Sequence, residues 1–125
     1  MKNKLIIVGA FIVLVLGLCI YEMIAIDKVA AESNEILTSL SNKKYSKNKL
    51  TELSEQLYEL WKSNMFMMAI FVQHDQIEEV EASLAIIKKS ISQGDNATFQ
   101  NEIARAQILI QGIRDSEFPH IENIL

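Results

Sequence analysis

The sequence predicts an all-α protein in which an N-terminal transmembrane helix continues into an up-and-down bundle of three to four helices. Three observations lead to this prediction. Leu5–Tyr21 carries no charged side chain. After Asp27 the apolar residues recur at spacings of three and four, and they show no sustained alternation of the kind found in strands. Half of the 125 residues are hydrophobic and one is Pro, so the chain fits one small folded domain rather than a low-complexity sequence.

The first expected element is a membrane anchor, residues 1–26, which includes a short cytoplasmic stub. As a helix Leu5–Ile26 is roughly 33 Å long, which matches the hydrocarbon core of a bilayer at about 30 Å. Lys2 and Lys4 precede the apolar run. The positive-inside rule therefore predicts a single-pass protein of the cell membrane, with a cytoplasmic N-terminus and residues 27–125 outside.

Two kinds of processing compete with an uncleaved anchor. A secretory signal peptide has an apolar core of about 7 to 15 residues, and the apolar run here is longer. Leu16–Cys19 resembles a lipoprotein box, in which the cysteine would be lipidated, but Leu18 stands where that motif has a small residue. Cleavage and lipidation of Cys19 both stay open as alternatives. Because Cys19 is the single cysteine, no internal disulfide can form.

An extracytoplasmic bundle is expected over residues 27–125. Its four helical stretches are residues 28–41, which continue out of the anchor, then 47–73, 76–93 and 96–114, followed by an irregular tail, 115–125. Ser46 or Asn48 can cap the second stretch, Gly94 ends the third, and Pro119 stops the fourth. The apolar seams favour a chain that folds back on itself, and a homodimeric coiled coil remains an alternative.

Three acidic residues are expected to cap helices. Asp75, followed three positions later by Glu78, comes close to a capping box for the third stretch, and Asp95 stands directly before the fourth. His74 lies beside the first two carboxylates. A zinc site needs three or four ligands, so we expect capping here and no metal site.

Met65–Val72 is a run of eight consecutive apolar residues. A helix buried along one stripe needs only about half of such positions, which leaves Phe66 and Ile70 surplus to the core. One interpretation is a helix more enclosed by its own bundle; the other is an adaptable contact surface. On the second interpretation the expected partner surface consists of Trp61, Phe66, Ile70 and His74.

Helix lengths indicate where this surface lies. The first helix rises roughly 21 Å from the membrane and the second returns through roughly 40 Å. Unless the chain bends near Tyr21–Lys28, the overrun brings Met65–Val72 to the level of the outer leaflet. We therefore expect contact with a membrane-protein partner or with the headgroup region of the bilayer.

Charge and motifs exclude several function classes. The formal net charge is −4, which argues against nucleic-acid binding. The sequence has no G-x-S-x-G, no H-E-x-x-H and no phosphate-binding glycine loop. We therefore expect a non-enzymatic protein with no catalytic residues and no cofactor.

The chain resembles an uncharacterised bacterial family of small, N-terminally membrane-anchored helical proteins known as a domain of unknown function. The residues that carry the resemblance are Trp61, the segment His74–Glu78, its continuation through Val80, Glu81 and Leu84, and the closing Asn123–Leu125. The resemblance implies no activity and no catalytic residues. It implies an association with genes for a small multi-pass membrane protein, and so a role as a partner subunit.

Two functions of different classes follow from the sequence. The first is an accessory or scaffolding subunit of an envelope membrane-protein complex, and it is the one we expect. The second is a small-ligand-sensing helical bundle. Because only about four residues precede the span, sensing also depends on a partner.

Overall fold

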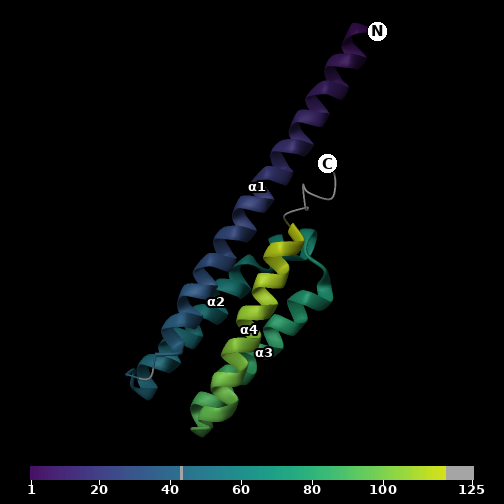
Figure 1. Ribbon diagram of the computed structural model, residues 1–125. Helices are drawn as coiled ribbons and strands as arrows, with labels where there is room; N and C mark the ends of the chain where they lie inside the picture. Colours follow the sequence, from purple (N-terminus) through teal and green to yellow (C-terminus); the bar gives the residue numbers. More distant parts are fainter. Residues whose placement is uncertain (43, 118–125) are drawn as a thin grey trace.

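The computed structural model describes residues 1–42 and 44–117 as four α-helices with short connections (Figure 1). They are α1 (Lys2–Leu40), α2 (Lys47–Phe71), α3 (His74–Gln93) and α4 (Asn96–Glu117). Each helix packs against two neighbours, in the order α1, α2, α3, α4 and back to α1. Over the described residues there is no strand, which confirms the all-α prediction and the helical bundle.

α1 is one uninterrupted helix with two different halves. It has 39 residues and is about 58 Å long. Met1–Tyr21 projects beyond the bundle with every side chain exposed (Figure 1), and this part is long and apolar enough to cross a membrane. The helix runs through Tyr21–Lys28 without a break. The joint that the sequence left open at this place is absent.

The second half of α1 is a helix of the bundle. Its buried residues are Glu22, Ile26, Val29, Ala30, Ser33, Leu37 and Leu40. They recur every three or four positions and so form one stripe along the helix. Packing therefore begins at Glu22, within the segment 1–26 that the sequence assigned to the anchor.

The helix boundaries lie close to those expected from the sequence. α2 ends at Phe71 rather than 73, α3 begins at His74 rather than 76, and α4 ends at Glu117 rather than 114. The connection between α2 and α3 is thus only Val72 and Gln73. Residues 118–125, the larger part of the expected tail, lie outside the described residues together with Lys43.

Local chemistry explains where two of the helices begin or end. Ser46 is the N-cap of α2 and accepts a hydrogen bond from the Lys49 backbone N–H at 3.3 Å, which confirms one of the two expected caps. Gly94 ends α3 with φ of 69°. Glycine reaches this left-handed conformation without the steric cost that a Cβ brings.

Trp61 joins α1 to α2 in the core. The side chain is 2% exposed, and its indole Nε1–H donates to the Ser33 hydroxyl, with the two atoms 2.8 Å apart. Ser33 is fully buried and donates in turn to the backbone carbonyl of Val29 at 2.7 Å. Both polar groups are therefore satisfied inside the bundle, as buried polar groups must be.

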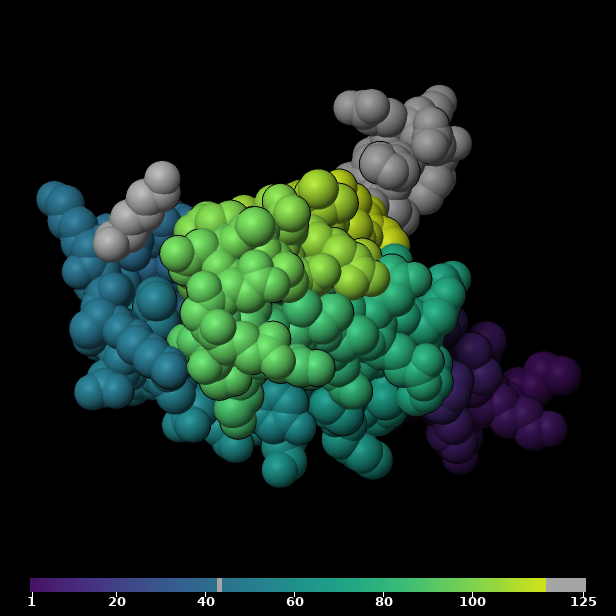
Figure 2. Space-filling model, turned by 90° about the horizontal axis from the view of Figure 1, so that it is seen from below, coloured from purple at the N-terminus to yellow at the C-terminus, as the bar shows by residue number. Residues whose placement is uncertain are grey.

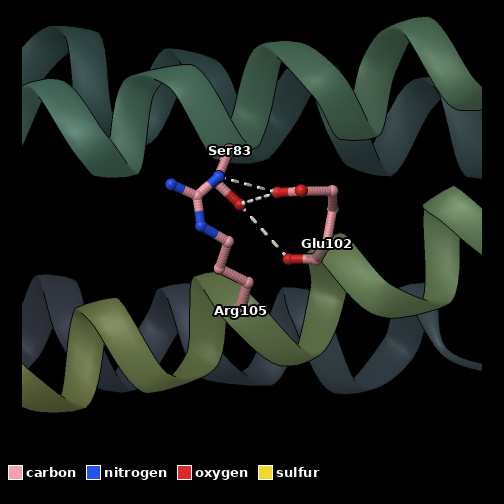
Figure 3. Close-up of polar contacts among 3 residues, drawn as sticks. All are labelled: Ser83, Glu102 and Arg105. Carbon is pink, nitrogen blue, oxygen red and sulfur yellow. Dashed lines mark hydrogen bonds and ion pairs between the residues drawn. The ribbon is translucent and has the colours of Figure 1, made fainter.

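Other polar contacts join α4 to its neighbours. The Ser83 hydroxyl of α3 lies 2.9 Å from the Glu102 carboxylate and 3.2 Å from the Glu102 carbonyl oxygen, while Arg105 lies 3.4 Å from the same carboxylate (Figure 3). Arg105 thus offsets the charge of a half-buried acid. On the other side, Arg114 of α4 forms an ion pair with Asp27 of α1.

We predict that Ser33→Ala destabilises the bundle by about 1–3 kcal/mol, because it leaves the buried Trp61 N–H without an acceptor. The matched control is Ser54→Ala. Ser54 is also buried, but its hydroxyl bonds only to the Thr51 carbonyl of its own helix. Urea unfolding of the full chain in detergent, followed by the fluorescence of the single Trp, measures both. Equal losses in the two variants would show that the contact between the helices adds nothing.

Candidate functional site

The outward face of α2 changes character along the helix. Over its first two-thirds the exposed positions at helical spacing are charged, with Glu52, Glu55, Glu59 and Lys62. Over the last two turns the same face carries Phe66 and Ile70. Large apolar side chains on a face that contacts water are unfavourable, so this end of α2 differs from the rest of the helix in the polarity of its exposed face.

Phe66, Ile70 and Phe71 form an exposed group that we call the α2 apolar patch. Their exposed fractions are 83%, 61% and 38%. The same turns bury Met68 on the opposite side, at 1% exposure. The interpretation in which the bundle encloses this helix all round is therefore wrong for Phe66 and Ile70. Neighbouring exposed aromatic and aliphatic side chains are typical of contact surfaces.

The hydrogen bond between Trp61 and Ser33 fixes the register of α2 against α1. The helices run antiparallel with the same rise per residue, so each step forward in α2 is level with one step back in α1. On this count Met68 is level with Ile26, and both are buried at 2% exposure or less, as residues of the core between the two helices are expected to be.

Extended to the patch, the register gives its height along α1. Ile70 is level with Ile24, and Phe66 is level with Lys28. The uncharged segment of α1 ends at Tyr21, so the two patch residues lie about 5 and 10 Å beyond that end. Ile24 and Tyr21 are themselves exposed, at 65% and 67%. The apolar surface of α1 and the patch thus occupy adjoining levels.

Trp61 does not belong to this surface. The sequence placed it with Phe66, Ile70 and His74, but the structure buries it against Ser33. The physical reason is its position on the helix: Trp61 lies on the same stripe as Leu57 and Met68, which are both 1% exposed. Trp61 is a core residue that sets the register of the bundle.

His74 lies on the exposed turn that follows the patch. Its Nε2 is 3.0 Å from the Glu78 Oε1, and both side chains are more than half exposed. Such a surface pair contributes little to stability. Within residues 1–42 and 44–117 no group of three or more His, Cys, Asp or Glu side chains could hold a metal ion.

The expected capping by Asp75 and Glu78 is wrong. α3 begins earlier, with Gln73 as its N-cap and no capping hydrogen bond from a side chain. Asp75 lies inside the first turn, where its carboxylate accepts from the Gln76 N–H at 3.0 Å. It still favours the helix through the positive end of the helix dipole. Glu78 reaches His74 instead of the helix start.

The expected cap at Asp95 is confirmed. Its Oδ1 accepts from the Thr98 backbone N–H at 3.1 Å and its Oδ2 accepts from the Thr98 hydroxyl at 2.7 Å. These hydrogen bonds favour the carboxylate and so lower the pKa of Asp95 below the ordinary value of 3.8. Asp95 is thus a structural residue at the start of α4.

A cavity that the sequence did not indicate lies at the other end of the bundle. It has a volume of about 580 Å³ and opens between the end of α1, the α1–α2 connection and the first turns of α4. Its members come from positions more than fifty residues apart, such as Leu40 and Asn101. Only the folded chain brings them together, so no motif could have revealed the site.

Comparison with known families identifies the bundle. Residues 23–124 match the family described as domain of unknown function DUF4363. The chain belongs to this family. No curated protein and no solved structure matches the chain.

The DUF4363 match and the packing begin at the same place. The family segment starts at residue 23, and the first buried side chain of the described bundle is Glu22. The exposed first half of α1 therefore lies before the family segment. The α2 apolar patch and the cavity at the far end both belong to it.

We predict that Asp95→Ala lowers the stability of the DUF4363 bundle at neutral pH, and that the difference from the natural chain narrows as the pH falls below 3.8. The sign follows from the lowered pKa: the contribution is present above the unfolded pKa and is lost when the folded carboxylate protonates. Urea midpoints across this pH range measure it. Asp115→Ala is the control, and an equal effect there would contradict capping by Asp95.

Proposed function

We propose that this DUF4363 protein is a non-enzymatic, single-pass membrane protein that works as an accessory subunit of an envelope membrane-protein complex. The observation that carries the proposal is the exposure of Phe66 and Ile70 on the outward face of α2. The partner contact then lies on the α2 apolar patch and the adjoining His74 turn.

The anchor in this proposal is the first half of α1. Leu5–Tyr21 is uncharged and exposed throughout, which is costly in water and favourable in lipid. Lys2 and Lys4 favour a cytoplasmic N-terminus, with the bundle outside. Since α1 has no break, the bundle stands directly on the membrane.

This arrangement brings the patch to the bilayer surface. The headgroup layer of one leaflet is about 5–8 Å thick, and the register puts Ile70 and Phe66 about 5 and 10 Å above Tyr21. A transmembrane partner that emerges beside α1 would meet the patch at this height. The proposal therefore assigns the patch to the part of a partner that leaves the membrane.

Electrostatics favour a protein partner over an anionic lipid surface. Asp75, Glu78 and Glu79 are exposed on the first turns of α3, beside the patch, and acidic groups are repelled by an anionic leaflet. The same carboxylates suit a partner that presents a basic side chain next to its apolar face. The patch and this acidic turn together define the chemistry of the expected partner.

A second candidate function has its own observation. The cavity of about 580 Å³ at the far end of the bundle has the size of a small-molecule site. A ligand there would make the protein a sensor that signals through a partner. For the membrane attachment, the alternative is that Cys19 is lipidated, which would make the protein a lipoprotein.

We predict that Phe66→Asp combined with Ile70→Asp abolishes co-purification of the partner while the bundle stays folded. Both side chains are exposed, so the free energy of unfolding should change by no more than about 0.5 kcal/mol. Loss of an apolar hot spot costs at least about 2 kcal/mol, or roughly thirtyfold in affinity. Crosslinked membranes, affinity purification and mass spectrometry measure the loss.

The matched control is Ser63→Asp, which adds a carboxylate to the outward face of α2 one turn before the patch. It should leave co-purification unchanged. An unfolded double variant would show that Phe66 and Ile70 belong to the core, and an equal loss in the Ser63→Asp variant would show that charge on α2, not the patch, matters.

We predict that the two ends of the chain lie on opposite sides of the membrane. In a Cys19→Ser background, a cysteine at the exposed Asn101 should react with a membrane-impermeant maleimide in intact cells. A cysteine at Lys2 should react only after permeabilisation. The reverse pattern would contradict the orientation. Loss of the first residues from the mature mass would indicate cleavage instead of an anchor.

A further inference from the structure

The cavity at the end of the bundle remote from the α2 apolar patch has a definite construction. Its base is apolar, with Leu40 and Phe99 buried at 1% and 4% exposure. Figure 2 looks onto this end and shows the blue end of α1 and start of α2 beside the light-green start of α4. Asn42 and Tyr45, between α1 and α2, therefore line the same cavity as the first turns of α4.

Side-chain carboxamides dominate the polar part of the cavity. Asn42, Asn96, Gln100 and Asn101 all line it, together with the phenol of Tyr45. The described lining residues include no charged side chain. A carboxamide presents both a donor and an acceptor in one plane, so this rim is suited to a neutral ligand that has donors and acceptors of its own.

A second, smaller cavity continues the first. It has a volume of about 150 Å³ and shares Leu50, Asn96 and Phe99 with its neighbour. It runs toward the end of α3, where Lys47 donates a hydrogen bond from Nζ to the Ser92 carbonyl at 3.4 Å. The two cavities together form a groove longer than a single small ring.

We propose that this groove binds an N-acetylated oligosaccharide. A sugar ring has apolar C–H faces, which suit the ring of Tyr45 at one side and the Phe99 base below. Its hydroxyls match the paired donors and acceptors of the carboxamides. The methyl group of an acetamido substituent fits the apolar base, and its amide can exchange hydrogen bonds with an Asn or Gln side chain.

Other ligand classes fit the lining less well. An anion would need a free cation or several backbone N–H groups aimed at it. The Lys47 ammonium, which lines the smaller cavity, already donates to the Ser92 carbonyl, and the N–H of Thr98 at the start of α4 is already bonded to Asp95. A cation would need carboxylates, and an entirely apolar ligand would desolvate the carboxamides without giving them new partners. A neutral ligand with both an apolar face and many hydroxyls satisfies both halves of the site.

The test is binding of N,N′,N″-triacetylchitotriose to the full chain in a detergent without a sugar headgroup, measured by isothermal titration calorimetry. The expected result is saturable binding that is lost or at least about tenfold weaker for maltotriose, which has the same kind of ring without the acetamido groups. Tenfold corresponds to about 1.4 kcal/mol, the scale of a hydrogen bond.

Variants assign the binding to the groove. Gln100→Ala and Tyr45→Ala should each weaken triacetylchitotriose binding by about tenfold or more. Gln56→Ala, an exposed amide on α2 outside the groove, should leave it unchanged. All three positions are exposed, and a thermal melt of each variant checks that the bundle remains folded.

The polymer and the free saccharide are separated by sedimentation with insoluble chitin. Co-sedimentation that soluble trisaccharide competes away assigns a glycan strand, and trisaccharide binding without co-sedimentation assigns a free saccharide. No saturable binding of triacetylchitotriose, equal binding of maltotriose, or binding unaffected by Gln100→Ala and Tyr45→Ala would each overturn the proposal. None of these results bears on the α2 apolar patch, which lies at the other end of the bundle.

Discussion

The continuity of α1 is the constraint on which the rest of the structure depends. One helix of 39 residues supplies both the exposed apolar segment and one quarter of the bundle. Because the helix has no break between Tyr21 and Lys28, each α1 residue lies at a fixed distance from the apolar segment. Residues of the other helices take their distance from the α1 residues beside which they pack. A flexible joint at this point would have made the same side chains free to turn in any direction.

A small number of polar contacts fix the positions of the other helices along α1. Trp61 and Ser33 set the height of α2, and the pair Arg114 with Asp27 does the same for α4. Apolar stripes alone allow helices to slide by a turn, since Leu, Ile and Val seams resemble one another at successive turns. The specific contacts remove that freedom. They hold the α2 apolar patch at the level where the uncharged segment of α1 ends. They also hold the groove lined by carboxamides at the opposite end of the bundle.

The sequence predicted the features that depend on local order. Helical spacing gave α2, α3 and α4 within three residues at each end and the end of α1 within one residue, Ser46 and Asp95 were recognised as caps, and Phe66 and Ile70 were recognised as surplus to a single stripe. It failed where burial depends on partners from distant segments. The indole of Trp61 is apolar enough for either surface or core, and it is buried because it lies on the stripe of Leu57 and Met68 and meets Ser33 of α1. The early start of α3 moved Asp75 from a cap into the first turn.

The groove at the far end shows a different limit of sequence reasoning. Asn, Gln and Tyr near helix ends are ordinary turn and cap residues, and nothing in their spacing sets them apart. They line one cavity only because the folded chain brings the end of α1 next to the start of α4. The two surfaces also differ in kind. One is an exposed apolar patch that adjoins an acidic turn, and the other is a cavity lined by carboxamides at the opposite end. The proposed partner and the proposed ligand would therefore occupy separate surfaces.

The most direct measurement is photo-crosslinking in intact cells from a reactive side chain at Phe66, with a second probe at Glu55 on the same outward face of α2. We predict a discrete protein adduct from position 66, absent from position 55 and identifiable by mass spectrometry. No protein adduct from position 66, or the same adducts from both positions, would contradict the assignment of the α2 apolar patch to a membrane-protein partner.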